Sequence, residues 1–264
     1  MSSSPKQKCF FVALGNNSYQ PTEHSGGAWR EDELHLAPVA GLIIHVLERW
    51  RSAQPEQNLE FSRIAFEVLG QIARDTIDVS IDVVRPGRTI ELVEATAVIG
   101  GRVTIRARAW LLQQTLTLDV EAHEFDPMPN RSEMSERSSL LEWPGGFCAS
   151  IEGVQSASTR PGRSQTWLTS DINLVCGEDV SALANFCRLL DAANGVAVRQ
   201  PFTSWMFPNV DLTLHFFRQP SGDWVGLDTR VAFGPGGAGL TSTVMHDDLG
   251  PVGTVNQSLT LRRL

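Results

Sequence analysis

Residues 178–195, EDVSALANFCRLLDAANG, have the period of an amphipathic helix with an acid in its apolar face. The apolar side chains recur every three or four residues, at Val180, Leu183, Ala184, Cys187 and Leu190. Asp191 falls on the same stripe. It also precedes Asn194-Gly195, a predicted C-terminal cap, and the helix dipole disfavours a negative charge at that end. Because one residue breaks two local rules, Asp191 is the leading candidate for a functional residue.

The first half of the chain has a matching helix that carries no acid on its apolar face. The helix is predicted to start at Pro38, and its apolar face consists of Val39, Leu42, Ile43, Val46, Leu47 and Trp50. A pair of predicted strands precedes each helix, at 9–14 and 18–22 and at 147–157 and 165–175. Alternating strands follow each helix, at 61–69, 76–85, 89–99 and 102–113, and at 210–218, 224–233, 240–246 and 253–263.

The shared order of elements predicts an internal duplication. A short echo of 83–86, VVRP, at 216–220, FFRQP, supports it. We expect an N-terminal unit at 1–125, with 114–121 extending its last strand, a linker rich in Pro, Ser and charge at 126–146, and a C-terminal unit at 147–264. A long helix wrapped by an antiparallel sheet in each unit is an α+β fold. Two such units can pair their sheets edge to edge, which is the double (tandem) hotdog architecture.

Gln257 is a second polar residue on an apolar face. It alternates in register with Val255, Leu259 and Leu261, and a buried amide without partners costs about 1–3 kcal/mol. The corresponding face of the strand at 102–113 is uninterrupted, with Val103, Ile105, Ala107, Ala109 and Leu111. We therefore expect Asp191 and Gln257 to converge and to hold a water molecule. Taken singly, the acid could instead cap a loop and the amide could lie at a frayed strand end.

Asn209 is the third candidate. It precedes the strand at 210–218, where alternation places it with the polar residues Asp211, Thr213 and His215. A solvated strand end explains it as well as a functional role does. Pro208 could distort the strand start and re-aim the side chain.

Composition and charge exclude several classes of protein. The net charge of -8 argues against nucleic acid as a partner. Residues 1–8 are polar and the apolar run at 9–14 is short, so we expect no signal peptide, no membrane insertion and a cytoplasmic protein. The four cysteines, Cys9, Cys148, Cys176 and Cys187, form no Cys-x-x-Cys pair and are expected to be reduced and mostly buried. The histidines have no metal-ligand spacing, so neither a metal nor another cofactor is expected.

Four segments resemble the acyl-CoA thioesterase II-like, double hotdog family, namely 167–173, 190–195, 207–212 and 257–261. The resemblance covers most of the chain outside the linker. It implies a triad of Asp, Thr or Ser, and Gln that orients water against a thioester carbonyl, with the acid at Asp191 and the amide at Gln257. The hydroxyl position falls on Asn209. The family often has a Gly-Gly pair before the first helix, where this chain has His35-Leu36-Ala37-Pro38.

The resemblance implies hydrolysis of acyl-CoA or a related acyl thioester in lipid metabolism, catalysed by Asp191, Asn209 and Gln257 without a cofactor. It also allows assembly into a homo-oligomer. The alternative is a non-catalytic protein that binds acyl thioesters or other lipophilic molecules, because Asn209 has no hydroxyl and the helix lead-in is altered. A hydratase or dehydratase of this fold is a weaker alternative, because no His and acid have the spacing of that class.

Overall fold

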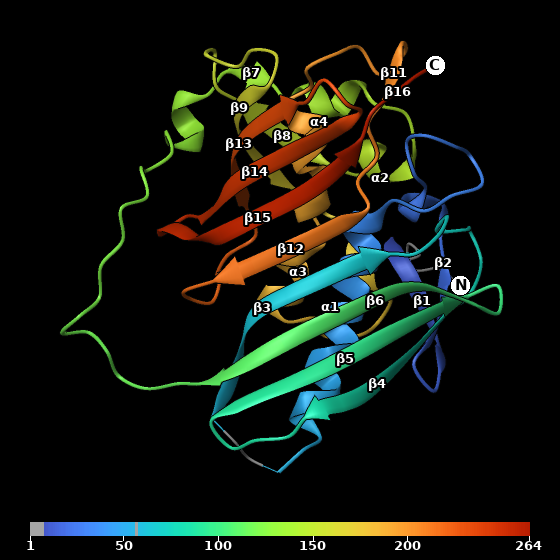
Figure 1. Cartoon of the computed structure of the whole chain (residues 1–264), viewed down its shortest axis with the longest axis vertical. Coiled ribbons are helices and arrows are strands. Elements are labelled where there is room, and N and C mark those ends of the chain that lie inside the picture. The colour runs from blue at the N-terminus through green and yellow to red at the C-terminus, as the bar shows by residue number, and fades with distance from the viewer. Residues whose placement is uncertain (1–7, 56–57) are drawn as a thin grey trace, which may run out of the picture.

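The computed structural model describes residues 8–55 and 58–264, so residues 1–7 of the predicted N-terminal unit lie outside the described part. Its main feature is one sheet that runs through both halves of the chain (Figure 1). The strand order is β10-β1-β2-β4-β5-β6-β3-β12-β15-β14-β13-β9-β8-β7. No helix in the described residues is long and apolar enough to span a membrane.

The first half of the chain supplies one long helix and most of the strands at one end of the sheet. Its elements are β1 (Cys9–Gly15), β2 (Ser18–Pro21), η1 (Glu23–Ser25), α1 (Leu36–Ser52), β3 (Leu59–Val68), β4 (Ile77–Arg85), β5 (Ile90–Ile99) and β6 (Arg102–Gln113). The turn between β1 and β2 places Asn16 and Asn17 at φ values of 52° and 57°, a conformation that asparagine tolerates well. The predicted hairpin, helix and four strands are all present.

The second half repeats this order with more short elements. Before its helices come η2 (Arg131–Glu133), β7 (Glu136–Arg137), η3 (Ser139–Glu142), α2 (Gly146–Ala149), β8 (Glu152–Gln155), β9 (Arg163–Thr169) and β10 (Asn173–Val175). The helical region and the later strands are α3 (Ala182–Cys187), η4 (Leu190–Ala192), α4 (Ala193–Val196), β11 (Trp205–Met206), β12 (Asp211–Phe216), β13 (Val225–Phe233), β14 (Ala238–Asp247), β15 (Gly250–Thr260) and β16 (Arg262–Arg263). The strand predicted at 147–157 therefore begins as a helical turn.

The two halves meet edge to edge between β3 and β12. These strands pair antiparallel, with Ile64 opposite Leu214. From this junction outward, the order β3-β6-β5-β4-β2-β1 matches β12-β15-β14-β13-β9-β8, which is the predicted duplication. The sequence similarity between 83–86 and 216–220 was wrong as support for the duplication. Arg85 ends β4, whereas Phe216 ends β12, which is the counterpart of β3.

The second predicted helix is broken instead of continuous. The helix α3 starts after Ser181, whose Oγ accepts the Ala184 N–H, and it ends at Cys187 with Arg188 as its C-cap. A 3-10 turn, η4, then carries Asp191 before α4 continues past Gly195, so the predicted Asn194-Gly195 cap is also wrong. The buried Arg188 lies at the break, and its guanidinium donates to the carbonyl oxygens of Ser170 and Ile172. Short 3-10 segments within helices often occur at functional positions.

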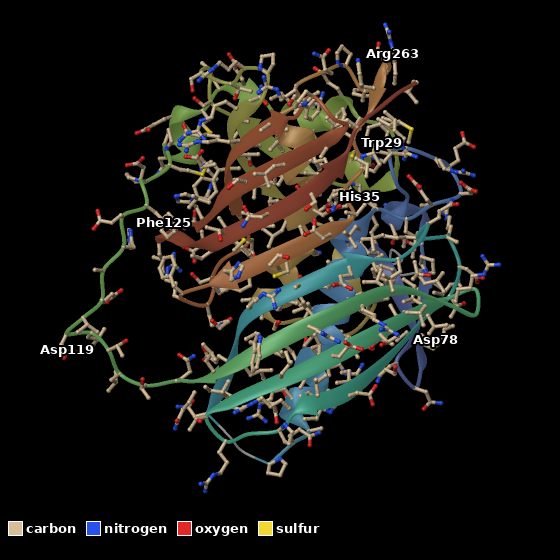
Figure 2. The ribbon with its side chains drawn as sticks, viewed as in Figure 1. Trp29, His35, Asp78, Asp119, Phe125 and Arg263 are labelled. Carbon is tan, nitrogen blue, oxygen red and sulfur yellow. A yellow bond between two sulfur atoms is a disulfide. The ribbon has the colours of Figure 1, made fainter. Side chains whose placement is uncertain are left out.

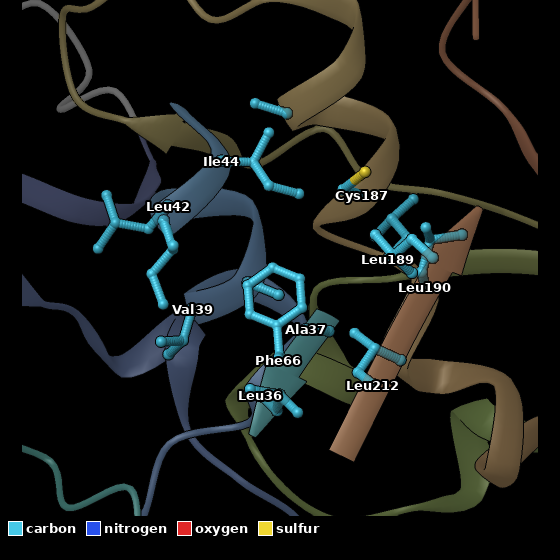
Figure 3. Close-up of a cluster of buried hydrophobic side chains, with 14 of the residues drawn as sticks. Leu36, Ala37, Val39, Leu42, Ile44, Phe66, Cys187, Leu189, Leu190 and Leu212 are labelled. Carbon is cyan, nitrogen blue, oxygen red and sulfur yellow. The ribbon is translucent and has the colours of Figure 1, made fainter. Parts of the chain in front are cut away.

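The helices α1 and α3 pack together behind the sheet (Figure 1). Gly41 lies at their crossing, where a Cβ atom would lie 2.5 Å from the Arg188 Cβ and 2.9 Å from its Cα. Figure 3 shows the core that results, with side chains of α1 facing Phe66 of β3, Leu212 of β12 and Leu190 of η4. The apolar face of α1 also buries His45, whose Nε2 lies 2.8 Å from Glu178 Oε2.

The expectation that all the cysteines are reduced was wrong for two of them. Cys9 and Cys176 form a disulfide, because β1 pairs in parallel with β10 and brings their Cα atoms to 5.3 Å. Their sequence separation of 167 residues leaves no spacing signal. Cys148 and Cys187 are free and buried, as predicted.

The segment after β6 is extended and exposed. The strand predicted at 114–121 is absent, and Leu116 is 91% exposed. Figure 2 shows Asp119 at the far tip of this segment. The chain returns to the C-terminal strands at Asp126, whose carbonyl oxygen lies 3.1 Å from His246 Nε2 of β14. Trp167 Nε1 then donates to the Pro129 carbonyl at 3.0 Å, and β7 pairs with β8. The predicted boundaries of the linker, at 125 and 146, stay a prediction.

The inward face of β6 is shorter than predicted. Val103 is 40% exposed, so the face predicted to be uninterrupted begins only at Ile105.

Candidate functional site

Asp191 lies at the wall of a cavity between the two halves. The cavity has a volume of about 970 Å³ and is lined by residues of both halves, including Trp29, His35 and Leu36 from the first and Trp143, Asp191 and Asn209 from the second. In Figure 2, His35 lies where the two halves meet. The Asp191 residue is only 4% exposed, as expected from its position on the apolar stripe.

The structure brings together the three residues that the sequence singled out. Asp191 Oδ1 accepts hydrogen bonds from Asn209 Nδ2 and Gln257 Nε2, each at 2.8 Å. Gln257 projects from β15 and is 1% exposed, and its Nε2 also lies 3.4 Å from the Asp191 carbonyl oxygen. Two amides therefore fix one oxygen of the carboxylate, and both donate to it.

Asn209 is not a solvated strand end. It is half-buried and forms a single bridge with Leu259 just before β12. Its Nδ2 also donates to the Asp211 carbonyl at 2.9 Å, so two acceptors hold the amide in one orientation. That orientation directs an N–H group at Asp191, although strand alternation had grouped Asn209 with Asp211.

His35 is a residue of the site that the sequence patterns did not reveal. Its Nδ1 lies 3.4 Å from Asp191 Oδ2 and accepts the Ala37 N–H at 3.1 Å, which caps α1. Burial lowers the pKa of His35 to about 3, so the ring is neutral. Because His35 precedes the helix, helical periodicity says nothing about it. Its only signal is an imidazole at an N-cap, where Ser, Thr, Asp and Asn are preferred.

Burial changes the acidity of Asp191. It raises the pKa of this carboxyl to about 7, against the opposing effect of the hydrogen bonds from Asn209 and Gln257. An acid with a pKa near the working pH can exchange protons efficiently in both directions. Asp191 therefore suits the role of a general base.

The other polar groups around the cavity support neither a thiol nucleophile nor a metal centre. Burial raises the pKa of Cys148, which lines the cavity, to about 12, so it stays a thiol. Across residues 8–55 and 58–264, no group of three or more His, Cys, Asp and Glu side chains is placed to hold a metal ion. The positive charges on the cavity wall come from Arg30 and Arg262.

Comparison with protein families matches both halves of the chain. Residues 26–112 match the acyl-CoA thioesterase N-terminal domain, and residues 119–261 match the acyl-CoA thioesterase C-terminal domain. The chain belongs to the acyl-CoA thioesterase family. A comparison with curated protein sequences gave no match.

Solved structures share the fold of this acyl-CoA thioesterase family member. A hot dog fold protein of unknown function from Alicyclobacillus acidocaldarius has a TM-score of 0.71 at 12% identity, covering 95% of each chain. The acyl-CoA thioesterase II of Mycobacterium marinum has a TM-score of 0.64 at 14% identity, covering 96% of each chain. The tesB protein of Mycobacterium avium subspecies paratuberculosis has a TM-score of 0.68 at 15% identity, covering 96% of this chain and 95% of that one. The predicted double hotdog fold is confirmed.

The buried acid of this thioesterase family member is expected to destabilise the fold at neutral pH. The pKa of Asp191 is raised from 3.8 to about 7 in the folded state, so the folded protein binds this proton more tightly than the unfolded chain. The stabilisation of the folded state by protonated Asp191 is complete below about pH 4, and it is lost as the pH rises to about 7. We expect Asp191→Asn to be more stable than the wild type at pH 8, with the difference disappearing near pH 4. Urea unfolding at both pH values measures this, and an equal difference at both would contradict it.

Proposed function

We propose that this chain hydrolyses acyl thioesters of coenzyme A, with Asp191 as the general base that activates a water molecule. The observation that carries the proposal is a buried carboxylate, held by two amide donors, at the wall of a 970 Å³ cavity. Its pKa of about 7 lets it take a proton from water and release it again near neutral pH.

The reaction needs one proton transfer in each direction. Water attacks the carbonyl carbon while its proton moves to Asp191, and the carbonyl oxygen becomes an oxyanion. When the C–O double bond reforms, the C–S bond breaks and the departing sulfur takes the proton from Asp191. The N-terminus of α1 opens onto the cavity through Leu36, and helix N-termini favour the negative charge of an oxyanion.

In this proposal, the triad position that carries a hydroxyl in the family is filled by an amide. Asn209 donates to the base, so it orients the carboxylate and leaves the other oxygen to act on water. Gln257 on β15 orients the carboxylate in the same way, because it donates to the same oxygen. The buried acid with a raised pKa at the wall of the cavity supports catalysis over the binding-only alternative, which needs no base.

The cavity wall agrees with an acyl-CoA substrate. Its apolar part includes Trp29, Trp143 and Met206, which suit an acyl chain, and its cations Arg30 and Arg262 suit the phosphates of the nucleotide. A cytoplasmic location, a role in lipid metabolism and assembly into a homo-oligomer remain predictions from the sequence.

The test measures thiol release and binding on the same samples. Purified protein is incubated with acyl-CoAs of several chain lengths, free thiol is followed, and binding is measured by calorimetry. We expect release from at least one chain length, with a rate that rises with pH through about 7 as Asp191 loses its proton. Binding without release from any chain length would support the non-catalytic alternative and overturn the proposal.

A further inference from the structure

We propose that His35 is a positioning residue for Asp191. When Asp191 Oδ2 takes a proton from water, the Nδ1 atom of His35 accepts a hydrogen bond from that proton. This proposal rests on the proposed function and adds a residue to the same site. His35 acts through Asp191 and itself neither gains nor loses a proton. It comes from the N-terminal half, so the base of the C-terminal half depends on both halves.

The first argument concerns the two oxygens of the carboxylate. Asp191 Oδ1 already accepts two hydrogen bonds at 2.8 Å, from Asn209 and Gln257. The other oxygen, Oδ2, faces His35 Nδ1 at 3.4 Å, and the two side chains are 5% and 15% exposed. A proton on Asp191 therefore belongs on Oδ2, next to the imidazole.

The second argument concerns the form of the imidazole. His35 Nδ1 accepts the Ala37 N–H at 3.1 Å, so it carries a lone pair and the ring hydrogen is on Nε2. A lone pair that faces a charged carboxylate oxygen repels it, whereas a protonated Oδ2 can donate to that lone pair. The Ala37 N–H and the Oδ2–H are then both donors to Nδ1. His35 thus favours the protonated form of Asp191, the form that exists after water has been activated.

The third argument is that the imidazole is held rigidly. The Ala37 N–H fixes its plane, and the ring of Phe147 in α2 packs on it with centroids 4.2 Å apart. The remaining titratable or charged groups on the cavity wall are Arg30 and Glu33 before α1, Cys148 of α2 and Arg262 of β16. His24 of η1 hydrogen-bonds Ser150 and lies outside this wall.

The proton balance of the reaction assigns His35 a definite step. Water loses a proton to Oδ2 as its oxygen bonds to the carbonyl carbon, and the O–H of Asp191 then donates to His35 Nδ1. When the C–S bond breaks, this proton moves from Oδ2 to the sulfur, and Nδ1 keeps only its bond from Ala37. The imidazole neither gains nor loses a proton, so the reaction does not require a positively charged His35.

The test replaces the imidazole and keeps the helix cap. In His35→Asn, the side-chain oxygen can accept the Ala37 N–H, and the amide N–H₂ faces Oδ2 and favours the carboxylate. We expect the Asp191 titration, followed by ¹³C NMR of labelled aspartate and assigned with Asp191→Asn, to move to lower pH by about one unit. The acidic limb of the kcat/KM profile should move with it, and kcat should fall about tenfold or more.

His215→Asn is the matched control, because His215 is exposed on β12 and should change neither measurement. A lower kcat with an unmoved Asp191 titration would mean that His35 is only structural and would overturn the proposal. A moved titration in a protein that hydrolyses no thioester would retain the His35 contact and reject the proposed function. If His35→Asn does not fold, the ¹⁵N shift of His35 Nδ1 in the wild type decides, because it must follow the Asp191 titration.

Discussion

Asp191→Asn should lower kcat/KM for acyl-CoA hydrolysis by about 10³-fold and leave the fold intact. The amide oxygen can still accept both hydrogen bonds from Asn209 and Gln257, so the surrounding structure has no reason to move. The lost property is basicity, because an amide cannot take a proton from water. Thiol release from the best acyl-CoA measures the change, and the circular dichroism spectrum checks the fold.

Asp78→Asn provides the matched control for this variant. Asp78 is an exposed carboxylate on β4, well away from His35 in Figure 2, so its loss should leave the rate unchanged. Activity of Asp191→Asn above about a tenth of the wild-type value would show that another group activates water, since general bases contribute about 10²–10⁴-fold. The proposed mechanism would then be wrong even if the thioesterase activity is real.

Gly41→Val should lower the free energy of unfolding by about 3 kcal/mol or more, because it separates the two helices at their crossing. A Cβ atom at Gly41 would lie 2.5 Å from the Arg188 Cβ, 2.9 Å from the Arg188 Cα and 3.1 Å from the Ala184 carbonyl oxygen. Two of these neighbours are backbone atoms, which cannot rotate away. Arg188 caps α3 just before η4, which carries Asp191, so a shift of this segment should also lower the activity.

Urea unfolding of Gly41→Val beside Gly236→Val measures this effect. Gly236 lies in the turn between β13 and β14, and a Cβ atom there would meet nothing within 4 Å. The control should stay within about 0.5 kcal/mol of the wild type, as surface substitutions usually do. Equal stability of the two variants would show that α1 and α3 can move apart without cost.

The sequence predicted those parts of the fold that depend on local periodicity. The 3.6-residue period located both helical regions, and alternation located the long strands of both halves. The same patterns marked Asp191 and Gln257, because each is a polar residue at an apolar position. Alternation only grouped Asn209 with the polar residues of its strand, and the family resemblance gave it a place in the site.

The missed features have a different physical origin. At the helix break, the Arg188 guanidinium bonds two carbonyl oxygens of the segment before β10. The disulfide depends on the pairing of β1 with β10. Neither leaves a local pattern, because each joins segments that only the folded sheet brings together.

The sequence by itself therefore determined that this chain is a duplicated α+β protein with an acid and an amide buried in its second half, because burial imposes a period on every helix and strand. Only the tertiary structure decided what surrounds that acid. It turned Asn209 toward Asp191 and placed His35, from the start of the other half, against the free carboxylate oxygen. The physical reason is that contacts between segments far apart in the chain depend on how their surfaces meet, and no period within either segment records that meeting.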